Sequence, residues 1–148
     1  MQTVRVKQIA LLLIFLLAIQ HLAFPQDSYR VQRVVDGDTI VLDNGLKVRL
    51  IGADTPETKH PNKPVEYYGK EASAFTKRMC EWKRVRLEYD REKTDRYGKI
   101  LAYVLVLEGG TELFLNAEII KQGYGHAYLK YPFNDEYMKS FREYERQA

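Results

Sequence analysis

Hydrophobic residues gather first near the amino end of the chain. Residues 9–24 are strongly apolar and follow Arg5 and Lys7, with no acidic residue before Asp27. A basic start and a short apolar stretch are typical of a secretory signal peptide. The stretch is short for a membrane span, yet no small-residue cleavage motif follows it, so an uncleaved anchor or a buried helix is the alternative. We expect a signal or anchor in residues 1–26 and one folded domain in residues 27–148.

The domain begins with short strand patterns. Residues 29–35, 39–42 and 46–52 are rich in β-branched and apolar residues, and Asp-Gly-Asp and Asp-Asn-Gly sequences separate them. These turn sequences predict a three-stranded meander. Alternation in the third strand places Arg49 on the face opposite its apolar neighbours.

The rest of the domain mixes helix and strand patterns. A loop at 56–68 contains three prolines, and a helix over 69–83 carries an apolar stripe of Ala72, Phe75, Met79 and Trp82. Further patterns predict two strands, a short helix and a last helix, at 84–89, 101–107, 116–122 and after Asn134. The fold class is β-rich α+β. Five strands and about three helices fit a closed barrel of the OB type, although a half-buried open sheet would give the same alternation.

Composition narrows the class without identifying a partner. A chain of 148 residues with 45% hydrophobic and 29% charged residues suits one globular domain and excludes a disordered or multispan membrane protein. The net charge of +3 includes Arg5 and Lys7, so the domain itself is nearly neutral. The single cysteine, Cys80, excludes an internal disulfide framework and is interpreted as a structural thiol.

The densest polar cluster surrounds the predicted meander and comprises Asp36, Asp38, Arg49, Asp54, Thr55 and Glu57. If the second and third strands form a hairpin, Asp38 and Asp54 lie side by side. Two carboxylates near backbone carbonyls suit a hard cation such as Ca²⁺. Spacing alone favours an ordinary turn and a solvated loop. Arg49 shifts the balance, since its guanidinium could bind two phosphate oxygens, with Glu57 placed to deprotonate a water.

Three other groups carry positive charge or aromatic rings. Residues 94–99 include Arg96, Tyr97 and Lys99 around a glycine, and a basic loop contains Lys63. Tyr128 and Tyr131 could stack on bases. A stretch such as 94–99 is more often an ordinary charged surface loop, and the tyrosines are equally compatible with ordinary core or rim positions.

Four motifs in order resemble the thermonuclease (staphylococcal nuclease-like) family. They are Val-Val-Asp-Gly-Asp-Thr-Ile at 34–40, the stretch from Val48 to Pro61, the stretch from Tyr68 to Lys77, and Thr-Asp-Arg-Tyr-Gly-Lys-Ile-Leu-Ala-Tyr-Val at 94–104. The resemblance is colinear over residues 29–146. It implies an OB-fold barrel and a secreted, Ca²⁺-dependent nuclease that cleaves DNA and RNA to 3′-phosphate products.

The resemblance also assigns roles position by position. Asp38 and Asp54 would bind Ca²⁺ together with the carbonyl of Thr55, Arg49 would bind the scissile phosphate, and Glu57 would be the general base. Lys63 would contact the substrate from a mobile loop. Arg96 and Tyr97 would contact a terminal phosphate, and Tyr128 would lie beside the base.

One departure bears on catalysis. The family's second active-site arginine falls at Lys99, which keeps the charge and loses the bidentate geometry, so we expect weaker transition-state stabilisation. The order of residues after Tyr128 also differs, which leaves the role of Tyr131 open.

The main hypothesis is a monomeric nuclease that is secreted, periplasmic or at the cell surface. It would contact a membrane only if residues 1–26 stay uncleaved. Two alternatives remain. One is a catalytically weakened OB-fold module that binds nucleic acid. The other is an anchored structural domain.

Overall fold

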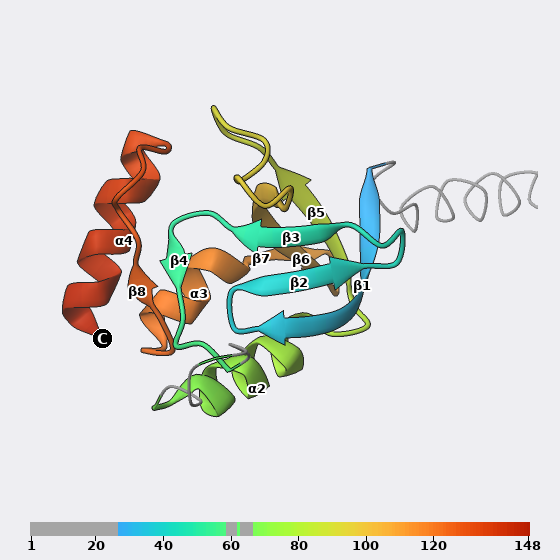
Figure 1. Ribbon diagram of the computed structural model, residues 1–148, viewed down its shortest axis with the longest axis horizontal. Helices are drawn as coiled ribbons and strands as arrows, with labels where there is room; N and C mark the ends of the chain where they lie inside the picture. Colours follow the sequence, from blue (N-terminus) through green and yellow to red (C-terminus); the bar gives the residue numbers. More distant parts are fainter. Residues whose placement is uncertain (1–26, 59–61, 63–66) are drawn as a thin grey trace, which may run out of the picture.

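The strands close into a small barrel, and helices cover its ends (Figure 1). The computed structural model describes residues 27–58, 62 and 67–148. Five strands form the barrel in the order β3-β2-β1-β5-β6: β1 (Ser28–Asp36), β2 (Thr39–Leu42), β3 (Lys47–Leu50), β5 (Arg84–Glu88) and β6 (Ile100–Glu108). Neighbours along this order are antiparallel, and a parallel pairing between β3 and β6 closes the ring. The predicted OB-type barrel is confirmed.

The meander forms where the turn residues predict it. Gly45 has φ 84°, a conformation that glycine adopts without strain, and Asn44 Oδ1 accepts a hydrogen bond from the Leu46 backbone N–H at 3.1 Å. Val48 and Leu50 are fully buried on one face of β3. Arg49, on the other face, is therefore available to a site outside the core.

Three helices pack on the barrel. α2 (Gly69–Cys80) lies against β1, and α3 (Leu115–Lys121) lies between α2 and α4 (Asp135–Gln147). Asn134 caps α4, because its Oδ1 accepts a hydrogen bond from the Tyr137 N–H at 3.1 Å. The predicted short and last helices are thereby confirmed.

The helix predicted over 69–83 ends earlier, at Cys80. Trp82 was placed on its buried stripe, which is wrong: the residue has φ 65° and its side chain is 63% exposed. The Trp82 N–H donates instead to the Val31 carbonyl at 2.9 Å, so the chain turns here to begin the β1–β5 pairing. Cys80 is buried, which raises the pKa of its thiol to about 12 and agrees with a structural role.

The sequence patterns did not predict three short strands. β7 (Thr111–Phe114) follows a two-glycine turn and pairs with β6, and β4 (Ala53–Asp54) pairs with β8 (His126–Ala127). Strands of two residues have no alternation to detect. The β4–β8 ribbon joins the end of the meander to the segment before α4, and both segments border the candidate site.

None of the helices in the described ranges is both long and apolar enough to cross a membrane. The predicted signal or anchor, residues 1–26, lies outside the described residues.

Candidate active site

The β2–β3 hairpin brings an arginine between two aspartates. Thr39 pairs with Arg49 across the hairpin, so Asp38 lies beside the guanidinium. Arg49 Nη1 donates to Asp38 Oδ1 at 2.5 Å, and Nη2 donates to Asp54 Oδ1 at 2.7 Å. The predicted convergence of Asp38 and Asp54 is thus present, and Arg49 links them.

Asp38 is the most enclosed member of this group, with an exposed fraction of only 2%. Its Oδ2 accepts hydrogen bonds from the Thr55 N–H at 2.9 Å and the Thr55 hydroxyl at 3.1 Å, and Oδ1 accepts from the Thr39 hydroxyl at 2.9 Å. A Cβ at Gly37 would lie 2.8 Å from Thr55, so the turn can approach this closely only with glycine. The backbone packing therefore fixes the carboxylate.

Burial and the neighbouring charges have opposite effects on the pKa values of Asp38 and Arg49. Burial raises the pKa of Asp38 above its ordinary value of 3.8, because Arg49 and the hydrogen-bond donors compensate only in part for lost hydration. Burial also works against the charge of Arg49, but Asp38 and Asp54 outweigh it and raise the arginine pKa. The site is thus one in which additional positive charge would stabilise the ionised acids.

The oxygen donors fit a hard cation. Two carboxylates converge on Arg49, and the one at Asp54 is half-exposed; Thr55, whose N–H and hydroxyl contact Asp38, directly follows Asp54. Over the described segments, no three His, Cys, Asp or Glu side chains lie close enough together to hold a metal ion. A cation here would accordingly have two carboxylate ligands and would complete its shell with carbonyl oxygens and water.

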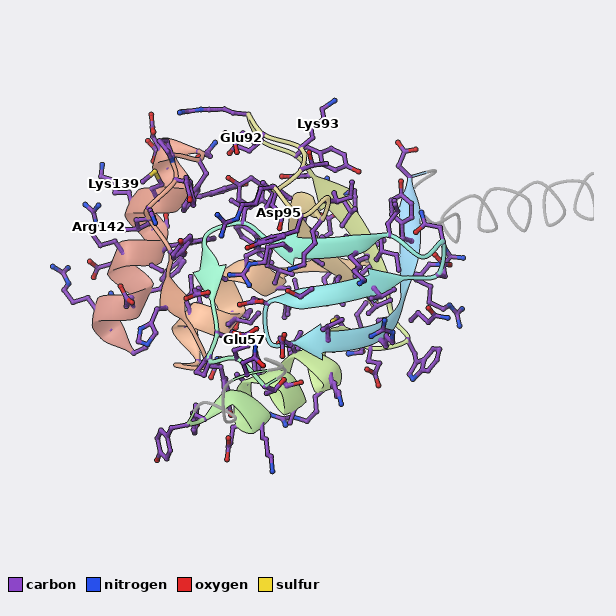
Figure 2. All side chains as sticks on the ribbon, in the orientation of Figure 1. Glu57, Glu92, Lys93, Asp95, Lys139 and Arg142 are labelled. Atoms are coloured by element: carbon purple, nitrogen blue, oxygen red, sulfur yellow. The ribbon has the colours of Figure 1, made fainter. Side chains whose placement is uncertain are left out.

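Glu57 lies in the segment between β4 and α2, which Figure 2 shows beside α2. The next residue, Thr58, is tied to the end of β1, because Asp36 Oδ1 accepts hydrogen bonds from the Thr58 N–H at 3.2 Å and from its hydroxyl. A Cβ at Gly69 would lie 3.1 Å from the Glu57 carbonyl oxygen. The sequence analysis gave Asp36 no role of its own; in the structure it holds the residue that follows Glu57.

A cleft of about 440 Å³ opens on the other side of Arg49. Its lining includes five of the residues singled out from the sequence: Arg49, Arg96, Tyr97, Lys99 and Tyr128. Tyr131, whose role was open, lines it as well, with its ring centroid 6.1 Å from that of Tyr128. Asp38, Asp54 and Glu57 are not part of the lining, so Arg49 is the residue shared by the cleft and the acidic group.

Asp95 shapes the cleft loop, a role that sequence reasoning missed. Its Oδ1 accepts hydrogen bonds from the backbone N–H groups of Tyr97 and Lys99, both at 2.9 Å. The resulting turn places Arg96 Cζ 4.8 Å and Lys99 Nζ 5.7 Å from the Tyr97 ring centroid. An aspartate two residues before a tyrosine and a glycine is a turn signal that could have indicated this. Lys63, the remaining predicted contact, lies outside the described residues.

Comparisons with known proteins place the chain in a family. Residues 47–148 match the family model described as staphylococcal nuclease homologue. The thermonuclease of Staphylococcus intermedius is 50% identical over 125 residues, covering 82% of this chain and 71% of that protein. That of Staphylococcus hyicus is 47% identical over 126 residues, covering 83% and 72%. Endonuclease YncB of Bacillus subtilis is 38% identical over 122 residues, covering 80% and 56%. The chain belongs to the staphylococcal nuclease homologue family.

Proposed function

We propose that this protein is a Ca²⁺-dependent nuclease that hydrolyses phosphodiester bonds of DNA and RNA and leaves 3′-phosphate products. Membership of the family and the relatives named thermonuclease make it a nuclease hydrolase. The observation that supports a metal-assisted site for phosphate is the position of Arg49, which contacts both aspartates and also lines the cleft. A phosphate at the mouth of the cleft would thus meet a guanidinium beside a cation site.

The acidic side of Arg49 is the proposed metal site. Asp38 and Asp54, with the Thr55 carbonyl, would hold Ca²⁺, which supplies charge stabilisation at the phosphate and acidifies a bound water. Arg49 would exchange its two carboxylate partners for two phosphate oxygens, and both arrangements are charge-assisted pairs. Additional positive charge beside Asp38 and Asp54 favours that exchange.

Proton transfer would fall to residues on either side of the phosphate. Glu57, held by the Asp36–Thr58 contact, would accept a proton from the attacking water. Lys99 would donate at the leaving oxygen from the cleft side. Arg96 and Tyr97 would contact a terminal phosphate, Tyr128 would lie against the base, and Lys63 would contact the strand from its loop.

A nucleic-acid-binding module with weakened catalysis is the second candidate. The lysine at position 99, where the resemblance implies arginine, favours it.

We further propose that residues 1–26 direct export, since the basic and apolar order of this segment is that of a signal. We also propose that the protein acts as a monomer outside the cytoplasm.

The test is cleavage of denatured DNA by the purified chain with Ca²⁺ and with a chelator. We expect cleavage only with Ca²⁺ and 3′-phosphate ends on the products. Glu57→Gln should lower kcat by about 10² to 10⁴, the range for loss of a general base, while single-stranded DNA affinity persists. Glu71→Gln, an exposed glutamate on α2, is the matched control and should leave kcat unchanged.

Each part of this experiment has an outcome that would contradict the proposal. Cleavage that persists in the chelator would rule out the metal site. An equal loss of binding and turnover in Glu57→Gln would make Glu57 structural. Binding without cleavage under any condition would favour the weakened module.

A further inference from the structure

Three aromatic rings stack from the core toward the surface at the start of α2, and a fourth ring, that of Tyr67, lies tilted by 33° against the last of them. Phe75, which is buried, stacks on Tyr124 with ring centroids 4.4 Å apart, and Tyr124 stacks on Tyr68 at 5.6 Å. Tyr67 lies against Tyr68 at 6.2 Å and is 94% exposed. The Tyr67 ring therefore presents nearly all of its surface to solvent, next to a ring that is stacked on the core.

The stack begins directly beside the Glu57 segment. Gly69 follows Tyr68, and a Cβ on Gly69 would lie 3.1 Å from the carbonyl oxygens of both Pro56 and Glu57. Figure 2 shows Glu57 on the α2 side of the β2–β3 hairpin and Asp95, in the cleft loop, on its other side. The stack therefore begins at the Glu57 segment, whereas Tyr128 and Arg49 line the cleft.

The backbone at Tyr68 is strained in a way that helix formation does not require. Tyr68 is the N-cap residue of α2 with φ 69° and ψ 2°, and its side chain makes no capping hydrogen bond. A left-handed conformation is unfavourable for a non-glycine residue, and Ser, Thr, Asp or Asn would cap the helix better. What tyrosine supplies here is a ring stacked on Tyr124.

Two lysines of α2 lie on a different face of the helix from Phe75. Lys70, in the first turn of α2, and Lys77 line a hollow of about 260 Å³ together with Thr58, the residue after Glu57. A polyanionic strand that follows this hollow would meet two ammonium groups beside the residue after Glu57. Single-strand sites in proteins combine a positively charged groove for the backbone with exposed aromatic rings for the bases.

We propose that Tyr67 and Tyr68 form a stacking platform for a base of the substrate strand, on the far side of the scissile phosphate from the Tyr128 cleft. The inference rests on the proposed nuclease function and extends it to a second base-binding position. Stacking on tyrosine is tolerant of base identity, so the platform lengthens the site without adding sequence preference.

The experiment compares substrates of different length. For the wild-type chain and its variants, kcat/KM with Ca²⁺ is measured on a thymidine dinucleotide and on an oligothymidylate of about 16 nucleotides, long enough to span a single-strand site. Tyr67→Ala should reduce the long-to-short ratio of kcat/KM by about 5- to 100-fold, the value of one base stack. Tyr67→Phe, which keeps the ring, should retain the wild-type ratio. Trp82→Ala removes an exposed aromatic residue from the other end of α2 and is the matched control.

The outcomes separate this inference from the function on which it rests. A wild-type ratio in Tyr67→Ala, or an equal loss in Tyr67→Phe or Trp82→Ala, overturns the platform and leaves the nuclease intact. A changed sedimentation coefficient in Tyr67→Ala, with an unchanged ratio, assigns the rings to contact with a second copy and also overturns it. A wild-type chain that cleaves neither substrate overturns the proposed function and the platform together.

Discussion

Arg49 has two different sets of partners in the proposed reaction. In the structure it neutralises Asp38 and Asp54 with hydrogen bonds of 2.5 and 2.7 Å. Its position on the outward face of β3 could be predicted, because strand alternation and two buried neighbours determine it. Its contact with Asp54 depends on the turn after β3, whose geometry alternation does not describe.

Lys99 is one of the positions at which the chain departs from the pattern of the family it resembles, and its substitution tests the cleft directly. In the proposed reaction Lys99→Arg would place a planar, bidentate donor at the leaving oxygen, so kcat on denatured DNA should rise by roughly tenfold, part of the value of one well-placed donor. Single-turnover cleavage with saturating Ca²⁺ measures this without product release.

Lys93→Arg is the matched control for that substitution. Lys93 lies in the same loop, is exposed and is not part of the cleft lining (Figure 2). An equal rise in both variants would mean that the gain comes from general basicity. A fall in Lys99→Arg would show that the cleft is shaped around the lysine.

At the scale of elements, the turn from β3 into β4 carries much of the packing between the barrel and α4. Gly52, in this turn, has φ 73°, and a Cβ there would lie 2.6 Å from Phe133 and 2.8 Å from Phe141. Its carbonyl also accepts a hydrogen bond from the Tyr128 N–H at 2.8 Å. One turn thus positions Asp54 on one side and the Tyr128 segment on the other.

Gly52→Ala should consequently destabilise the protein by about 2–4 kcal/mol, since it adds a clash with two buried rings to the strain of a positive φ. Urea unfolding followed by tyrosine fluorescence measures the loss. Gly45→Ala isolates the strain, because Gly45 has φ 84° and a Cβ there would meet nothing within 4 Å. It should lose only about 1 kcal/mol. Equal losses in the two variants would refute the packing argument.

Long elements were predictable and short ones were not. The apolar periodicity around Phe141 and the Asn134 cap indicated α4 before the structure was known. The end of α2 was misplaced, because Trp82 continues the apolar spacing although the backbone has already turned. The parallel β3–β6 pairing that closes the barrel joins strands far apart in the sequence, so it could be inferred only through the family resemblance.

At the scale of the whole molecule, Asp90 joins the barrel to the α4 region across one end of the cleft. Its Oδ2 accepts hydrogen bonds from the Tyr103 hydroxyl at 2.5 Å and from the Asn134 N–H at 2.7 Å. Asp90 and Phe133 both line the cleft. No sequence pattern relates three residues on separate elements, which explains why this connection could not be predicted.

The Asp90 connection should make the stability of the protein depend on pH. Partial burial opposes the charge of Asp90, whose side chain is 14% exposed, but the hydrogen bonds from Tyr103 and from the Arg91 and Asn134 backbones lower its pKa below 3.8. A lowered pKa means that the ionised carboxylate stabilises the fold above pH 3.8, and that this contribution disappears as the pH falls through the folded-state pKa.

A double-mutant cycle between Asp90→Asn and Tyr103→Phe isolates this contribution. The coupling free energy from urea unfolding should be about 1.5–3 kcal/mol at pH 7, the range for a hydrogen bond to a charged group, and it should decrease progressively below pH 3.8 as the carboxyl is protonated. Because the cycle subtracts the separate effects of each substitution, general acid destabilisation cancels. A coupling that stays constant between pH 7 and about pH 3, or one that grows on acidification, would show that the Asp90–Tyr103 contact does not depend on the aspartate charge.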